Sequence, residues 1–408
     1  MSIIQPFPAL RPAPEKAMEV SCVPYDVPYE SEVRDILRTN PLSFLHVTRS
    51  EAEFAEGENP AAAAVLERSK ENLQRFIDNG TLAAEAEPSL YVYRLAAGSL
   101  EQTGIVACAS LDEYERGLIK KHEKTRPDKV KDRTDHMLAL RAQTGLIFLA
   151  FRGTEKTRQL IRQTTETKPL YDFTCSGNVR HTVWRIEEAG EAVEAFADVP
   201  ALYIADGHHR AESAFRARES LKAANPNHTG TEDYNFVVAG IFPSEDLRIM
   251  AYNRVAKDLN GLSPKELVAK LDSNFTVTED GIKYPHSRGN FSMYLDGRWF
   301  SLKFTGDFAV DADPRERLDV SLLQKFILES ILAIGDPRTD SRIAFVGGAR
   351  GVEELEKLVD DGEMAVAFSL FPTTMEDLFA VSDAGEIMPP KSTWFEPKLK
   401  DGLFVHLI

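Results

Sequence analysis

The most informative stretch of the sequence is Leu202-Tyr-Ile-Ala-Asp-Gly-His-His-Arg-Ala-Glu-Ser-Ala-Phe215. Its first four residues are apolar and typical of a buried strand, and Asp206-Gly207 is a turn signal. From His208 onward the apolar residues recur at helical spacing. The stretch therefore predicts a buried strand that turns at a glycine into a helix. In open α/β sheets, ligands bind at this end of a strand.

The residues of this turn suit a phosphate group. A helix N-terminus offers backbone N–H groups and a partial positive charge, and Gly207 permits a close approach to its backbone. His208, His209 and Arg210 add donors, and an arginine can hold a phosphate through two hydrogen bonds. Asp206 adds a carboxylate that can bind Mg²⁺ or accept a proton from a substrate. The alternative is that Asp206 only caps the helix and that the histidines are solvated.

The same residues carry a family resemblance. Ala205-Asp-Gly-His-His-Arg-Ala-Glu212 resembles the Gly-x-His-Arg type of signature in the ParB/sulfiredoxin superfamily. That group includes sulfiredoxin, the CTP-using ParB partition proteins and an archaeal free-serine kinase. Nearly the whole chain, from Pro6-Phe-Pro-Ala-Leu-Arg-Pro12 onward, resembles domain-of-unknown-function family 1015 within it. The resemblance implies a ParB/sulfiredoxin-like core with a mixed sheet, elaborated by a second α/β layer.

Two members of the superfamily differ from this chain in their chemistry. Sulfiredoxin needs a cysteine directly before the His-Arg pair of its motif, and His208 occupies that place here. ParB proteins carry a helix-turn-helix and a basic face, and neither is evident in this sequence. The free-serine kinase shares an Asp-Gly-His-His-Arg type of motif and transfers a phosphoryl group from a nucleotide to free serine. The resemblance therefore implies phosphoryl transfer to a hydroxyl group.

Composition limits the class of protein and its partners. The chain has 408 residues, of which 43% are hydrophobic and 27% charged, as is typical of a soluble globular protein. No apolar run approaches the ~18 residues of a membrane span, and the N-terminus lacks a signal-peptide layout. We therefore expect a cytoplasmic protein without a membrane partner. The three cysteines have no metal-type spacing, and a net charge of −16 argues against nucleic acid as a partner.

Strand and helix patterns alternate along the chain, which predicts a mixed α/β fold. Residues 146–151 and 234–242 are expected to be buried strands. Residues 40–47 are expected to form a further strand, and residues 318–334 a long amphipathic helix.

The pattern changes after Asp258. We therefore divide the chain into a domain 1–258, which carries the motif, and a C-terminal α/β domain 259–408, whose last segment is expected to return to the site.

Two further segments match the family's pattern and add candidate site residues. The segments His122-Glu-Lys-Thr125 and Lys131-Asp-Arg133 have counterparts in the family, and the resemblance implies that Glu123 and Arg133 are pocket residues. The alternative is a solvated helix end. Pro24-Tyr-Asp-Val27 either lines the pocket or forms a turn closed by an Asp side chain.

A third segment, Met388-Pro-Pro-Lys-Ser-Thr393, is also very similar to the family's. Its two prolines fix the backbone, so that Lys391, Ser392 and Thr393 are presented on a stiff loop. A lysine beside two hydroxyl groups can clamp a phosphate. The alternative is an ordinary terminal turn.

Together these patterns predict a nucleotide-dependent phosphotransferase, a small-molecule kinase that acts on a small hydroxyl metabolite such as free serine. The candidate catalytic residues are Asp206, Glu123 and His209. The candidate nucleotide- and phosphate-binding residues are Gly207, His208, Arg210, Arg133, Lys391, Ser392 and Thr393. The resemblance implies ATP or ADP as the nucleotide, with Mg²⁺ held by Asp206. The alternative is a nucleotide-binding regulatory or scaffold protein without turnover. The oligomeric state is left open, with a homodimer among the alternatives.

Overall fold

The computed structural model describes residues 3–175, 177–307 and 313–408. The chain forms two compact units, each of which is described by itself. The first unit comprises Met1–Lys121, Thr125–Leu247 and Pro397–Ile408, and the second comprises His122–Lys124 and Arg248–Glu396. The sequence placed the boundary at residue 258, whereas the structure assigns residues 248–258 to the second unit. No helix among the described residues is long and apolar enough to cross a membrane.

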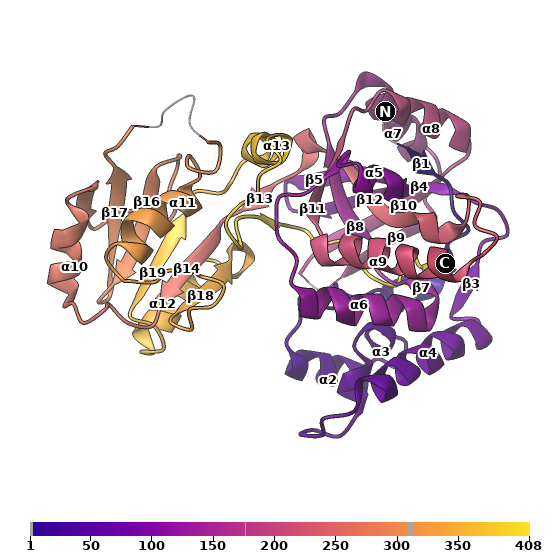
Figure 1. Ribbon diagram of the computed structural model, residues 1–408, viewed down its shortest axis with the longest axis horizontal. Coiled ribbons are helices and arrows are strands. Elements are labelled where there is room, and N and C mark those ends of the chain that lie inside the picture. Colours follow the sequence, from indigo (N-terminus) through magenta and orange to yellow (C-terminus); the bar gives the residue numbers. More distant parts are fainter. Residues whose placement is uncertain (1–2, 176, 308–312) are drawn as a thin grey trace. The chain divides into compact units, whose positions relative to one another are not determined.

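A nine-stranded mixed sheet forms the centre of the first unit (Figure 1). The strand order is β6-β11-β8-β12-β5-β4-β10-β9, with β1 paired to β5. β11 is parallel to β6 and β12 is parallel to β8, whereas the other neighbours are antiparallel. The mixed α/β class is thereby confirmed, and the kinship of this core to the ParB/sulfiredoxin group stays a prediction. The strands are β1 (Ile4–Gln5), β4 (Leu90–Ala97), β5 (Leu100–Ser110), β6 (Ile119–Lys120), β8 (Ile147–Phe151), β9 (Tyr171–Cys175), β10 (Val179–Ile186), β11 (Leu202–Asp206) and β12 (Phe236–Pro243).

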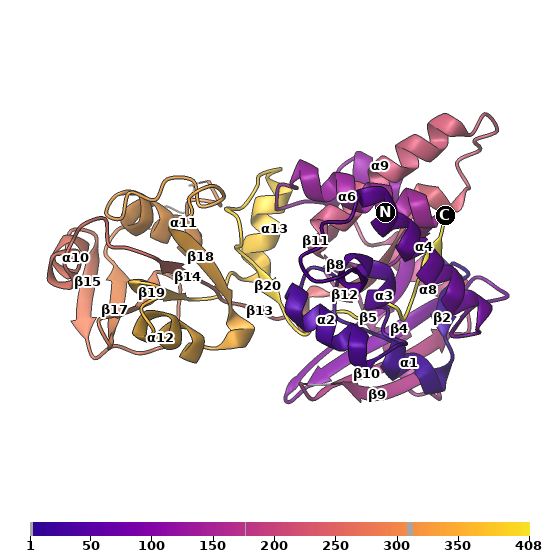
Figure 2. The same cartoon turned by 90° about the horizontal axis from the view of Figure 1, so that it is seen from below.

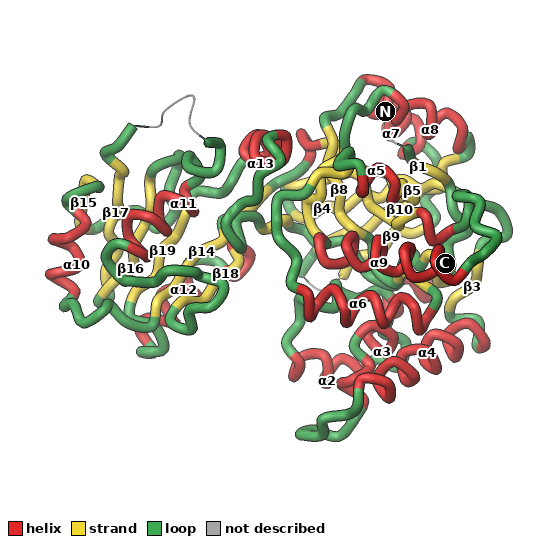
Figure 3. The backbone as a smooth tube through the Cα atoms, in the orientation of Figure 1, coloured by secondary structure: helices red, strands yellow, loops and turns green. Residues whose placement is uncertain are grey.

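Helices pack against one face of this sheet. Alternate strand residues such as Val92 and Ile105 enter a single apolar core together with Phe196 and the alanines of one face of α9. Helix α6 packs against α9, and the Ser213 hydroxyl donates a 3.0 Å hydrogen bond to the Val130 carbonyl (Figure 3). The helices are α5 (Leu111–Glu115), α6 (Pro127–Leu140), α7 (Glu155–Thr165), α8 (Ala189–Ala197) and α9 (His208–Ala224).

Residues 397–408 contribute to the packing on the opposite face. The rings of Tyr91 and Phe404 are 4.8 Å apart, and Leu399 packs against Gly240. Strand β21 (His406–Leu407) pairs with β7 (Ala142–Gln143) just before β8 begins. This segment therefore brings residues from the far end of the chain beside the amino end of β8.

An N-terminal helical layer adds a second apolar core to this unit. Phe44, Leu73 and Phe76 pack there with Val405. The sequence prediction of a strand at 40–47 was wrong, because a turn is followed by the short buried helix α3 (Leu45–Thr48), and periodicity alone does not separate a buried strand from a buried helix. The elements are β2 (Leu10–Pro12), β3 (Leu82–Ala84), α1 (Ala17–Val20), α2 (Glu30–Thr39), α3 (Leu45–Thr48) and α4 (Ala62–Asp78).

The second unit is built on a six-stranded antiparallel sheet in the order β15-β17-β16-β19-β14-β18 (Figure 2). The long helix expected at 318–334 is instead a short helix followed by a π-helical turn, Gln324–Glu329. The strands are β14 (Tyr252–Ala256), β15 (Phe275–Glu279), β16 (Asn290–Leu295), β17 (Arg298–Phe304), β18 (Ile343–Gly347) and β19 (Val366–Leu370), with β13 (Ile249–Met250) paired to β20 (Trp394–Phe395). The helices are α10 (Pro264–Leu271), α11 (Asp319–Leu323), α12 (Glu353–Asp360) and α13 (Met375–Asp383).

Candidate functional site

The turn between β11 and α9 has the conformation that the sequence predicts. Gly207 has φ 94° and ψ 29°, the left-handed region in which glycine is favoured, and α9 begins at the next residue. A side chain here would also be crowded, because a Cβ atom on Gly207 would lie 3.1 Å from Nε of Arg210. The backbone therefore needs glycine at this position, and the N-cap of this 17-residue helix carries no capping side chain.

We expect Gly207→Ala to lower the free energy of unfolding of the first unit by about 1–2 kcal/mol, because alanine is strained in the left-handed region. Gly190→Ala is a matched control, since Gly190 is the second residue of α8, has φ outside that region and has no atom within 4 Å of an added Cβ. It should be neutral or stabilising, because alanine favours helix. Urea unfolding measures both, and equal effects would contradict the strained-turn interpretation.

Arg210 holds the carboxyl end of β11 in place. Its side chain is buried, and its guanidinium donates to Oδ2 of Asp206 at 2.8 Å and to the Leu146 carbonyl at 2.6 Å. The topology explains this contact, because β8 runs antiparallel to β11 and so starts beside Asp206. The sequence assigned Arg210 to a phosphate. The structure gives it internal partners, and its role in phosphate binding stays a prediction.

Asp206 lies between two cationic groups. Lys398 Nζ donates to Oδ1 at 3.0 Å, and Arg210 donates to Oδ2. Burial alone would raise the pKa of Asp206, but the charges of Lys398 and Arg210 outweigh it and hold the pKa well below its usual range. A carboxylate in this position is a weak proton acceptor and a poor ligand for a further cation. Asp206 therefore does not fit the predicted Mg²⁺ site.

The two histidines of the motif, His208 and His209, lie at the start of α9 and interact with other residues of the first unit. The backbone N–H of Arg126 donates to Nε2 of His209 at 3.0 Å, which links the start of α6 to the start of α9. His208 is 5% exposed, and its charge also lowers the pKa of Asp206. No group of three or more His, Cys, Asp or Glu side chains that could hold a metal occurs among the described residues.

Asp401 was not anticipated from the sequence. It is 2% exposed, and its Oδ1 lies 3.8 Å from Nη1 of Arg210. Burial raises the pKa of Asp401 to about 7 against the opposing charge of Arg210. Lys398 was missed as well. Both residues lie in a charged segment without periodicity, and no local signal marked them.

Arg133 and Tyr25 line the same small cavity as Arg210 and Asp401. The Arg133 guanidinium lies 4.4 Å from the centroid of the Tyr25 ring, and its Nη1 donates to the Thr48 carbonyl at 3.3 Å. Two segments that the sequence marked, Pro24–Val27 and Lys131–Arg133, are thus brought together with the motif helix.

The other candidate residues belong to the second unit. Nε2 of His122, the neighbour of Glu123, lies 3.2 Å from Oγ1 of Thr393, and the backbone N–H of Met388 donates to the His122 carbonyl at 2.8 Å. The Ser392 hydroxyl donates to the Pro389 carbonyl at 2.7 Å. The segment that carries Glu123 therefore packs against the loop 388–393.

Lys391 has φ 57° and is exposed, and its carbonyl accepts a 3.0 Å hydrogen bond from the buried Arg254. The roles of Glu123, Lys391, Ser392 and Thr393 beside Asp206 stay predictions.

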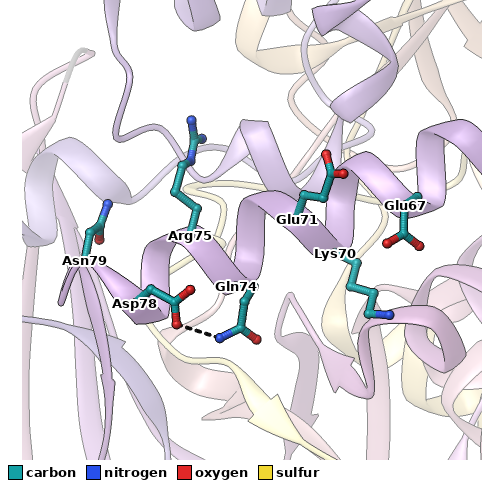
Figure 4. Close-up of a pocket in the computed structure, with 7 residues that line it drawn as sticks. All are labelled: Glu67, Lys70, Glu71, Gln74, Arg75, Asp78 and Asn79. Atoms are coloured by element: carbon teal, nitrogen blue, oxygen red, sulfur yellow. Dashed lines mark hydrogen bonds between the residues drawn. The ribbon is translucent and has the colours of Figure 1, made fainter.

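A second hollow runs along the exposed side of α4 (Figure 4). Within it, Gln74 donates to Asp78 at 2.8 Å. All its lining residues come from this helix and its C-terminal end, so a ligand there would stay largely in solvent. The lining residues are Glu67, Lys70, Glu71, Gln74, Arg75, Asp78 and Asn79.

Comparison with known proteins adds weak structural likenesses. A mutant free serine kinase in complex with AMP is 15% identical with a TM-score of 0.38, covering 73% of this chain and 91% of its own. A C-terminally truncated SbnI from Staphylococcus aureus is 12% identical with a TM-score of 0.40, covering 74% and 87%. A conserved hypothetical protein from Pyrococcus furiosus is 16% identical with a TM-score of 0.36, covering 74% and 95%. Likenesses of this size decide neither fold nor function.

Comparison of the sequence with protein families, unlike the structural likenesses, identifies the family. No curated protein matches the chain. Residues 4–321, most of the chain and all of the β11–α9 motif, match the family described as "Protein of unknown function (DUF1015)". The chain therefore belongs to the DUF1015 family.

Proposed function

We propose that the protein binds ATP or ADP at the turn between β11 and α9 and transfers the terminal phosphoryl group to a small hydroxyl metabolite, with free serine as the first acceptor to test. The observation that carries this proposal is the meeting of two features at one strand end. One is the start of α9 on Gly207, and the other is the ammonium group of Lys398. A helix start and a lysine ammonium both favour a phosphate.

The local charge supports an anionic ligand. The chain as a whole has a net charge of −16, yet Lys398 and Arg210 both contact the carboxylate of Asp206 at this turn. Burial raises the pKa of Asp401, the other carboxylate beside Arg210, to about 7, which reduces its negative charge. A local excess of positive charge in an acidic protein attracts anions to that place. The resemblance of the motif to that of the free-serine kinase supports the same assignment.

Phosphoryl transfer suits such a site because it depends on positioning and on charge neutralisation more than on covalent chemistry by the protein. The Gly207 turn would hold the phosphates at its backbone, and Lys398 would offset part of their charge. Glu123, His209 and the Lys391–Thr393 loop remain candidates for acceptor and phosphate contacts. No step is assigned to Mg²⁺, since Asp206 does not fit it.

A second function, nucleotide binding without turnover, is favoured by one observation. Both carboxylate oxygens of Asp206 are paired with cations, and its pKa is held low, so it is not a ready proton acceptor. A regulatory protein needs no such acceptor. The two functions differ in one measurable respect, which is whether a phosphorylated product forms.

The test combines binding with turnover. Calorimetry with ATP and ADP, with and without Mg²⁺, measures affinity, and ³¹P NMR follows transfer to serine and related hydroxy compounds. Lys398→Met is expected to weaken nucleotide binding by about 10–100-fold, the scale of a charged hydrogen bond. Lys400→Met, two residues along the same segment, should leave affinity within about threefold.

The outcomes separate the alternatives. Equal affinities for the two variants would remove Lys398 from the site. If the wild type binds nucleotide but forms no product with a broad set of acceptors, the kinase function is wrong and the regulatory function stands. If it binds neither ATP nor ADP, both proposed functions are wrong.

A further inference from the structure

Asp401 is held firmly inside the first unit. Its backbone N–H donates to the Cys22 carbonyl at 3.0 Å, and its carbonyl accepts from the Cys22 N–H at 3.1 Å. These two bonds fix the residue against the N-terminal segment. The side chain is 3% exposed, and Arg210 at 3.8 Å is the cation nearest to it among the ion pairs of the described residues. A carboxylate is therefore kept in the interior with one distant ion-pair partner.

The carboxylate also packs against backbone that must lack a side chain. A Cβ atom on Gly145 would lie 2.4 Å from Oδ1 of Asp401. Gly145 precedes β8, whose first residues lie beside the end of β11. Asp401 and Asp206 thus lie on either side of the Arg210 guanidinium, which is the link between them.

A cavity next to Asp401 has room for one water molecule. It measures about 10 Å³, close to the space that one water molecule needs, and Tyr25, Arg133, Arg210 and Asp401 contribute to its lining. The charged and titratable groups that face Asp401 include Arg210 from α9, Arg133 and His136 from α6, Tyr25 and Asp26 from the segment before α2, Cys22 and, from β4, Tyr93. A water with such polar neighbours can pass a proton between a substrate and a buried carboxylate.

The two carboxylates differ in how tightly they hold a proton. Asp206 is ionised because two cations touch it. Asp401 has a pKa of about 7 because burial disfavours its charge. Pairs of acidic groups whose surroundings separate their pKa values mark the acid and base of a site.

We propose that Asp401 is the proton acceptor of the phosphotransferase and that Asp206 is a positioning residue that orients Arg210 and Lys398. This inference rests on the proposed function. In the step, the acceptor hydroxyl oxygen forms a bond to the terminal phosphorus of the nucleotide. The bond from that phosphorus to the bridging oxygen breaks, and its electron pair leaves with the shortened nucleotide. The hydroxyl proton passes through one water to the Asp401 carboxylate, which later releases it to solvent.

The experiment compares three variants with the wild type over a range of pH. Asp401→Asn is expected to lower kcat by about 10²–10⁴-fold, the usual effect of removing a general base, while nucleotide affinity stays within about threefold. Asp206→Asn should weaken nucleotide binding and keep the pH dependence. Glu113→Gln is the matched control, because Glu113 is also a buried carboxylate of this unit, 1% exposed, and accepts a 2.8 Å hydrogen bond from the backbone N–H of Ile3.

The wild-type pH profile tests the inference without any variant. The rate should rise with pH along a limb of apparent pKa near 7, and Asp401→Asn should abolish that limb. A wild-type rate that does not change between pH 5 and 9 overturns the assignment, even if the variant does not fold. If the wild type transfers phosphoryl groups and Asp401→Asn is equally fast, Asp401 is not the proton acceptor, but the proposed function still holds. A wild type without any transfer overturns both.

Discussion

Replacing Arg210 by alanine is expected to destabilise the first unit by about 3–5 kcal/mol. The guanidinium is buried, donates hydrogen bonds to Asp206 and to the Leu146 carbonyl, and lies 3.8 Å from the Asp401 carboxylate. Its loss leaves the Leu146 carbonyl without this donor, Asp206 with Lys398 as its cation, and Asp401 as a buried carboxylate whose nearest cation is gone. Urea unfolding followed by the fluorescence of Trp184, which lies in β10, measures the effect.

The control is Arg216→Ala on the same helix. Arg216 is 60% exposed and pairs with Glu212, four residues earlier, so its removal should cost no more than about 1 kcal/mol. Replacing Trp299 and Trp394 by phenylalanine in all proteins confines the signal to the first unit. If Arg210→Ala loses nucleotide affinity at unchanged stability, its guanidinium serves a ligand, as the sequence first suggested.

Stability should also depend on Asp401 and on pH. Its pKa of about 7 in the folded state exceeds the ordinary value of 3.8, so the folded state holds the proton more tightly. The contribution of this residue is therefore complete below about pH 4 and is lost as the pH rises to about 7. Asp401→Asn should match the wild type near pH 4 and exceed its stability by up to about 4 kcal/mol at pH 8.

The difference between the two proteins is the quantity to measure, because other buried groups titrate as well. Burial lowers the pKa of His136 to about 4 and that of His181 to about 3, so both lower stability as the pH falls below their ordinary value of 6.5. Above about pH 5 both rings are neutral in the folded wild type, and His181 does not line the cavity of Asp401. The difference between wild type and variant is therefore compared above about pH 5, where neither ring changes its charge in the folded state. A stability difference that stays constant from pH 5 to 8 would contradict the burial of an acidic Asp401.

Local sequence signals predicted the motif element well. The change from an apolar run to helical spacing at Asp206-Gly207 appears in the structure as β11, a left-handed glycine and α9. Each part depends on residues next to one another in the chain, where turn chemistry and periodicity act directly. Short buried runs were harder, as residues 40–47 show, because a helix and a strand that are buried on all sides have the same apolar composition.

The composition of the site could be predicted only in part. Arg133, Tyr25 and Arg210 were singled out, and they line one cavity. The internal partners of Arg210 could not be predicted, because they come from the residue before β8 and from the segment 397–408, far away in sequence. Asp401 lies on that same segment, and pairing with Cys22 and with β7 places it there. Such long-range pairing leaves no mark in the local pattern.

The division of the first unit into separated pieces of chain has a consequence for its synthesis. Residues 248–396 form most of the second unit and are made before residues 397–408, which pack on the sheet of the first unit. At about 5–20 residues per second, the ribosome needs roughly 8–30 s for this insertion. During that interval Tyr91 lacks its contact with Phe404, and Gly240 lacks its contact with Leu399. Apolar surface of the nascent sheet is therefore exposed to solvent. Chaperones that recognise exposed apolar surface would find the growing chain most accessible in this interval.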